Sequence, residues 1–167
     1  MTRTRALLGS LVFLVLAPGT VAGLVPWWLS RWVQQLPFLG VAPLRAAGAV
    51  LLAAGVVALL DSFVRFAVRG LGTPAPVLPP GRLVVTGLYR HVRNPMYVAI
   101  LSAVLGQALL LGERRVLGWG GVLWLAFHLF VVGYEEPTLR SKFGADYDAF
   151  RANVPRWIPR LTPWRGR

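Results

Sequence analysis

Two short polar segments carry the side chains of this chain that are best suited to chemistry. The first is residues 87–97, Gly-Leu-Tyr-Arg-His-Val-Arg-Asn-Pro-Met-Tyr, and the second is the pair Glu135-Glu136 at the end of an apolar run. Carboxylates at the C-terminal end of a helix oppose the helix dipole, so this pair is expected to face a cation. Aromatic faces and carboxylates both stabilise sulfonium or ammonium charge. Together the two segments suit a cationic or zwitterionic ligand.

Two apolar runs are predicted to bring these segments together. Residues 96–111 and 116–134 are each long enough for a helix, and only residues 112–115 separate them. A connection this short joins antiparallel neighbours, so the start of the first helix and the end of the second lie side by side. Asn94-Pro95 marks that start, because Asn favours the N-cap and Pro fits the first helical position.

The same side chains also fit simpler roles. The two glutamates could cap a following helix or pair with Arg90 or Arg93 across the hairpin. Arg93 could extend to lipid headgroups, and Tyr97 could be an interfacial aromatic residue. On the residues alone these alternatives stay open.

His128 is a further candidate on the second apolar run. Trp124, His128 and Glu135 share one helix face at spacings i, i+4 and i+11. His128 is therefore predicted to contact a ligand bound near Glu135, with an interhelical hydrogen bond as the alternative.

The composition indicates a membrane protein. The chain of 167 residues is 56% hydrophobic and 14% charged, whereas about 25% of a soluble domain is charged. The net charge of +12 could indicate nucleic-acid binding. The basic residues cluster at the ends of apolar runs, however, which is typical of membrane topology, and no nucleic-acid partner is predicted. The absence of cysteine excludes thiolate nucleophiles and Cys-ligated metals, and no metal site is predicted.

We predict an all-α integral membrane protein with about four transmembrane helices, forming a single domain over residues 1–167. The spans are expected at residues 6–29, 44–67, 96–111 and 116–134. The last two form a C-terminal helical hairpin. Short amphipathic surface helices should follow Pro137, with a break at Gly144.

The first two spans contain polar features of their own. The first could instead be a signal peptide, with small residues near Ala22. In the second, Asp61 and Arg65 lie four residues apart on one helix face and are expected to form an ion pair.

Basic residues predict the orientation in the membrane. Four spans place both termini on one side, with 14 of the 18 basic residues. The four on the other side are Arg31, Arg45, Arg114 and Arg115. The positive-inside rule then places both termini and both polar segments on the cytoplasmic side of an inner membrane. The excess of arginine over lysine, 17 to 1, is typical of a GC-rich bacterial genome.

At the two polar segments the chain resembles the integral-membrane methyltransferases that include isoprenylcysteine carboxyl methyltransferase and the phospholipid methyltransferases. That family carries Arg-His-Pro-x-Tyr-x-Gly where a helix starts, a Glu-Glu pair one hairpin later, and Phe-Gly-x-x-Tyr in a surface helix. The matching residues, all within residues 87–159, are Arg93-Asn94-Pro95-Met96-Tyr97-Val98-Ala99, Glu135-Glu136 and Phe143-Gly144-Ala145-Asp146-Tyr147.

The resemblance implies an S-adenosylmethionine pocket at the cytoplasmic end of the hairpin. The predicted cofactor-binding residues are Tyr89, Arg93, Asn94, Pro95, Tyr97, His128, Glu135 and Glu136. Of these, Arg93, Glu135 and Glu136 are the predicted catalytic residues. Asn94 stands where the isoprenylcysteine enzymes have histidine, and Ala99 where the family has a glycine. Both departures bear on the acceptor more than on the cofactor.

The implied reaction is methyl transfer to a lipid-borne or prenylated acceptor, either a small molecule or a protein. Its nucleophile would be a carboxylate, or an amine that loses a proton to Glu135 or Glu136. Two other classes fit the composition. One is a small non-catalytic membrane protein that binds anionic lipid or a partner. The other is a nicotinamide-dependent lipid reductase on a related fold.

Overall fold

A computed structural model describes residues 3–68 and 83–166, and this part of the chain contains helices and no strands. The elements are α1 (Arg3–Gly19), the π-helical turn η1 (Thr20–Leu24), α2 (Val25–Ser30), the 3-10 turn η2 (Phe38–Gly40), α3 (Pro43–Val68), the 3-10 turn η3 (Gly87–Arg90), α4 (Pro95–Leu111), α5 (Arg114–Phe130), the π-helical turn η4 (Val131–Glu135), α6 (Glu136–Phe143) and α7 (Ala145–Asn153). The predicted all-α fold is confirmed. The proline-rich sequence of residues 69–94 predicts a polar, extended connection outside the membrane, and residues 69–82 of it lie outside the described residues.

Within residues 3–68 and 83–166, three continuous helical segments are long and apolar enough to cross a membrane, namely Leu11–Ser30, Pro43–Arg65 and Arg114–Phe143. The remaining predicted span, α4, is a shorter apolar helix of 17 residues. At 1.5 Å per residue it is about 25 Å long, a little less than the ~30 Å hydrocarbon core. The last segment continues as a helix beyond the predicted end at residue 134.

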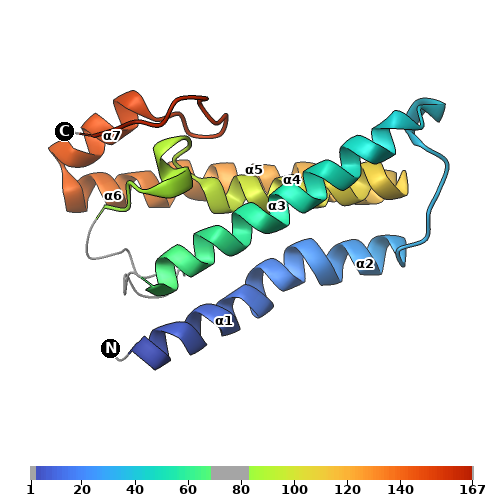
Figure 1. Cartoon of the computed structure of the whole chain (residues 1–167), viewed down its shortest axis with the longest axis horizontal. Coiled ribbons are helices and arrows are strands. Elements are labelled where there is room, and N and C mark those ends of the chain that lie inside the picture. The colour runs from blue at the N-terminus through green and yellow to red at the C-terminus, as the bar shows by residue number, and fades with distance from the viewer. Residues whose placement is uncertain (1–2, 69–82, 167) are drawn as a thin grey trace.

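The helices run back and forth along one axis (Figure 1). The start of α1, the turn η3, the helices α6 and α7 and the C-terminal tail lie at one end of the molecule. The α2–α3 connection and the turn between α4 and α5 lie at the other end. The hairpin therefore returns the Glu135-Glu136 pair to the end that carries residues 87–97, as the short connection predicts.

α3 and α4 pack with their backbones close together. A Cβ atom on Gly55 would lie 2.7 Å from both Ala103 N and Ala99 O, and one on Gly48 would lie 2.6 Å from Leu110 N. Small residues are what permit helices in a membrane to approach this closely. Ala99, the residue in place of the family's glycine, lies in this contact with α3.

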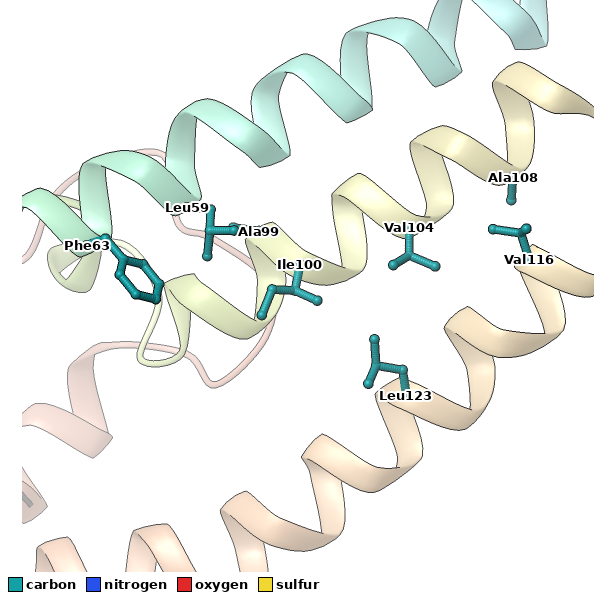
Figure 2. Close-up of a cluster of buried hydrophobic side chains, with 8 residues drawn as sticks. All are labelled: Leu59, Phe63, Ala99, Ile100, Val104, Ala108, Val116 and Leu123. Carbon is teal, nitrogen blue, oxygen red and sulfur yellow. The ribbon is translucent and has the colours of Figure 1, made fainter. Parts of the chain in front are cut away.

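The main hydrophobic core lies on both sides of α4 (Figure 2). Its buried members are Leu59, Phe63, Ala99, Ile100, Val104, Ala108, Val116 and Leu123. Side chains of α3 meet those of α4 on one side, and side chains of α5 meet them on the other. This packing fixes α4, and with it the start of the hairpin.

A proline explains how the first helical segment attaches to the bundle. Pro26 has no N–H to donate to the carbonyl of Ala22, and the N–H of Val25 donates to Thr20 within the π turn η1. The carbonyls of Val21 and Ala22 instead accept hydrogen bonds from Trp119 Nε1 at 2.8 Å and from Gln107 Nε2 at 2.7 Å. These two bonds join the segment to α4 and α5.

The amphipathic helices α6 and α7 are separated at Gly144, as predicted. Gly144 has φ of +49°, a conformation that favours glycine. The apolar side chains of the two helices form a second cluster, in which Tyr147, Phe150 and Val154 are buried. Leu83, Val85 and Trp164 pack against this cluster, so α7 also holds the tail in place.

The close approach of α3 and α4 predicts the effect of a single methyl group. Gly55→Ala should lower the thermal unfolding midpoint in detergent, because the contacting atoms belong to backbone and overpacking costs about 1–3 kcal/mol. Gly118→Ala is the matched control, since a Cβ there meets nothing within 4 Å and alanine favours helix. Equal midpoints for the two variants would contradict the tight contact.

Candidate functional site

Tyr97 and Glu135 meet across the hairpin. Tyr97, in the first turn of α4, donates a hydrogen bond from its hydroxyl to Glu135 Oε2 at 2.9 Å. The Tyr97 ring packs on Phe127 of α5, with ring centroids 4.6 Å apart. Within the described residues Glu135 has no ion pair. Its carboxylate is therefore held by one phenol and has no neutralising cation there.

Glu136 has a different environment. Its Oε1 accepts from Arg93 Nη1 at 2.9 Å and from Arg156 Nε at 2.6 Å, and its Oε2 accepts from Arg156 Nη2 at 3.0 Å. The side chains of Arg93 and Glu136 are 9% and 11% exposed. An ion pair with Arg90 or Arg93 was the alternative role expected for the glutamates, and Glu136 forms it with Arg93. Arg90 donates instead to the carbonyl of Trp164.

Arg156 comes from the C-terminal tail, which runs alongside residues 90–94. The bonds between these two segments join Arg93 N to Pro155 O, His91 Nδ1 to Arg160 O, Arg160 N to His91 O, and Trp164 N to Arg90 O. Pro155 and Pro159, with Trp157 and Trp164, predict from the sequence only an extended aromatic and basic tail. The structure shows that the tail is part of the polar cluster at this end of the molecule.

Asn94 and Pro95 begin α4 as predicted, with Asn94 at the N-cap and Pro95 in the first turn. The Asn94 side chain does not cap the helix, however. Its Nδ2 donates to the carbonyl of Arg156 at 3.2 Å, and it makes no capping hydrogen bond. The amide binds the tail because the tail lies directly over the start of the helix.

Two tyrosines complete the cluster. Tyr147, from the Phe-Gly-x-x-Tyr sequence, accepts a hydrogen bond from Arg93 Nη1 at 3.3 Å. Burial, followed by the charge of Glu136, raises the pKa of Tyr147. Burial, followed by the charge of Glu135, raises the pKa of Tyr89 far above its ordinary value. Both phenols therefore stay protonated at neutral pH and can act as hydrogen-bond donors.

His128 lies between two indole rings. Trp124 stacks on it at a centroid distance of 5.3 Å, and Trp157 lies at 6.1 Å. Trp157 Nε1 donates to His128 Nδ1 at 3.2 Å, which places the proton of a neutral imidazole on Nε2. Within the described residues His128 has no hydrogen bond to either glutamate. It joins α5 to the tail.

A proline also explains the turn that carries Glu135. Pro137 has no N–H for the carbonyl of Gly133, and the preceding residue, Glu136, donates its N–H to Val131 five positions back. This bond closes the π-helical turn η4 over Val131–Glu135. Such turns are frequent at functional sites. At the end of this turn, the side chains of Glu135 and Glu136 bind different partners.

One buried donor of the cluster has no hydrogen-bond partner among the described residues. Arg93 Nε is buried and makes no hydrogen bond within the described part of the chain. Buried polar atoms are normally satisfied, so an unpaired one indicates an additional partner. Arg93 Nε and the carboxylate of Glu135 thus supply one free donor and one free anion at the same end of the hairpin.

Sequence reasoning missed the second cation of this cluster. Two adjacent glutamates facing only Arg93 leave one negative charge to be neutralised, and the tail Val-Pro-Arg-Trp offered an arginine. That charge imbalance was the available signal. The position of the tail was not predictable, because its contacts depend on the fold of residues 83–94.

Comparison with known proteins assigns the chain to a family. A family model described as phospholipid methyltransferase matches residues 43–146, which is more than half of the chain. The chain belongs to this family of membrane methyltransferases. The family predicted from the hairpin motifs is thus confirmed, and the matched region ends before the tail that supplies Arg156.

Two relatives illustrate the likeness. The "Protein-S-isoprenylcysteine O-methyltransferase" of Schizosaccharomyces pombe is 40% identical over 78 residues, which cover 46% of this chain and 33% of that protein. An "Uncharacterized protein" of Haemophilus influenzae is 37% identical over 65 residues, which cover 38% of this chain and all of that protein. The chain thus spans about a third of the length of the yeast methyltransferase. No solved structure matches.

Because the two glutamates have different environments, replacing each with glutamine should change the free energy of unfolding by different amounts. Glu136→Gln should lower the free energy of unfolding by about 3 kcal/mol, because it leaves Arg93 and Arg156 without their shared counter-ion. Glu135→Gln should cost less than about 1 kcal/mol, since a glutamine oxygen can still accept from Tyr97. Denaturation of the purified variants in detergent measures both values.

Asp148→Asn is the matched control for a carboxylate lost on the same end of the molecule. Asp148 pairs with Arg140 at 3.1 Å, but the two side chains are 47% and 61% exposed, and exposed pairs contribute at most about 1 kcal/mol. If Glu136→Gln were no more destabilising than Asp148→Asn, the central role of Glu136 in the fold would be wrong.

Proposed function

We propose that this protein transfers a methyl group from S-adenosylmethionine to a lipid-borne or prenylated acceptor at the cytoplasmic membrane face. The observation that carries the proposal is that a carboxylate without an ion pair and a buried donor without an acceptor lie at the same end of the hairpin. Glu135 has no cation partner among the described residues, and Arg93 Nε has no acceptor there. Membership of a methyltransferase family supports the same reaction.

The donor set fits the proposed cofactor. S-adenosylmethionine supplies an electrophilic methyl group on a sulfonium, and it also carries an ammonium and a carboxylate. Glu135 and the ring of Tyr97 suit its positive charges, and Arg93 Nε suits its carboxylate. Asn94 and Pro95 would hold this end of α4 in place rather than bind the cofactor. His128 would hold the tail in place through its hydrogen bond with Trp157 and would not touch the cofactor itself.

The chain's own residues would act by positioning. Tyr97 orients the carboxylate of Glu135, and Glu136 orients the guanidinium of Arg93. Alignment and exclusion of water are the main sources of rate for a direct displacement. A carboxylate acceptor needs no base. For an amine acceptor, Glu135 would take the proton, since Glu136 is occupied by two arginines.

Binding of the methyl donor tests the proposal. Wild-type protein should bind S-adenosylmethionine in a calorimetric titration, and Glu135→Gln should weaken binding by about 10- to 100-fold, the value of one charge-assisted contact. Tyr97→Phe should weaken it less. Asp148→Asn should bind as wild type, which controls for general loss of negative charge.

Absence of binding to the wild type would refute the proposed function, and binding of a nicotinamide cofactor in its place would support the reductase. Arg93→Ala should also reduce binding, but its folding must be checked because it breaks an ion pair. Incubation of membranes with isotopically labelled donor, followed by mass analysis of lipids and proteins, identifies the acceptor. Label should appear with wild type and fall with Glu135→Gln.

We also propose that the site faces the cytoplasm, and the absence of cysteine allows a direct test. Leu39, in the α2–α3 connection, and Leu161, in the C-terminal tail, are 93% and 97% exposed. These two segments lie at opposite ends of the molecule (Figure 1). In intact cells a membrane-impermeant maleimide should label Leu39→Cys, and it should label Leu161→Cys only after permeabilisation. The cysteine-free wild type is the control, and the reverse pattern would contradict the proposed orientation.

A further inference from the structure

An open cleft of about 570 Å³ lies on the side of Glu136 that faces α7 and the tail. Its lining residues are Val132, Glu136, Pro137, Arg140, Ser141, Arg151 and Arg156. We propose that this cleft binds an anionic membrane phospholipid, with the phosphate among the three arginines and the acyl chains along α5. The proposal goes beyond methyl transfer, because it requires neither a methyl donor nor a reaction.

The charge of the cleft favours an anion. Arg140, Arg151 and Arg156 contribute three positive charges to the lining, and Glu136 contributes one negative charge. Glu136 is already shared with Arg93. Its carboxylate therefore cannot neutralise the cleft, and the lining keeps a positive excess.

The arginines also have donors to spare. Arg151 forms no ion pair in the part of the chain that the structure describes. The ion pair that Arg140 forms among the described residues is an exposed one with Asp148, which is weak and exchangeable. Arg156 uses Nε and one terminal nitrogen on Glu136, so its other terminal nitrogen is left for a ligand. Arginine forks match phosphate oxygens, and the hydroxyl of Ser141 adds a donor.

An apolar strip leads from the membrane to this cleft. Val122, Leu125, Leu129 and Val132 lie on one face of the helical segment of α5 and η4 and are 60%, 50%, 63% and 42% exposed. Val132 is both the end of this strip and a wall of the cleft. A soluble phosphate would use only the arginines. A phospholipid would use the arginines and the strip together, at the depth where a spanning helix meets the headgroups.

Direct titration with short-chain lipids tests the proposal. Purified protein in a non-ionic detergent is titrated by calorimetry with dioctanoyl phosphatidylglycerol, dioctanoyl phosphatidylcholine and inorganic phosphate, all without methyl donor. Phosphatidylglycerol should bind tightest. Arg151→Ala should weaken its binding by about tenfold or more, the effect of one charge-assisted hydrogen bond.

Arg165→Ala is the matched control. It removes the same charge from the exposed tail at the same end of the molecule, outside the lining of the cleft, and should leave lipid binding unchanged. Equal losses in Arg151→Ala and Arg165→Ala would overturn the proposal in favour of general surface charge. Equal affinity for phosphatidylcholine and phosphatidylglycerol would overturn the preference for an anionic lipid. Binding of inorganic phosphate as tight as that of the lipid would overturn the role of the apolar strip.

The same variants separate this inference from the proposed function. Arg151→Ala should bind S-adenosylmethionine as wild type does, because among the described residues no ion pair joins Arg151 to Glu135 and no hydrogen bond joins it to Arg93 Nε. A protein that binds lipid but no methyl donor would retain the cleft and lose the proposed reaction. If the protein binds methyl donor but Arg151→Ala does not weaken lipid binding, the proposed reaction stands and the lipid cleft is refuted.

Discussion

The shared ion pair of Glu136 holds together three segments that are far apart in the sequence. Arg93 precedes the hairpin, Glu136 follows it, and Arg156 lies in the tail. A buried carboxylate is costly unless it is paired and hydrogen-bonded. Glu136 meets that requirement only when all three segments are in place. The positions of Tyr97, Glu135 and the cleft arginines follow from the same arrangement, so the geometry of both proposed binding regions depends on this one carboxylate.

Proline sets the backbone conformation at two places where the helices bind other elements. In each case a π turn ends two residues before a proline: η1 ends before Pro26, and η4 ends before Pro137. The first turn leaves carbonyls that accept from Gln107 and Trp119. The second carries Glu135 toward Tyr97 while Glu136 turns to the arginines. A regular α-helix satisfies its own carbonyls, whereas a proline in its interior leaves the carbonyl four residues back without a donor.

Local patterns predicted most of this fold. The apolar runs, the short hairpin connection, the Asn94-Pro95 helix start and the break at Gly144 each follow from nearby residues, and the Asp61–Arg65 pair forms at 2.7 Å. The helix itself continues beyond residue 134, because the π turn η4 lets the helical segment pass Pro137 without a break. The contacts of the tail with residues 90–94 were out of reach, since they join residues more than sixty positions apart. Such long-range pairing has no periodic signature in a single sequence.

The two adjacent glutamates show why identical side chains in one motif can have different functions. Glu136 is neutralised twice by arginine, so it can neither attract another cation nor readily accept a proton. Its effect on a ligand can only pass through Arg93. Glu135 accepts from a neutral phenol and keeps its charge available. The arginine that completes this division lies beyond the region shared with the family model, which ends at residue 146. In this chain the tail therefore determines which glutamate is held by two arginines and which one has no ion pair among the described residues.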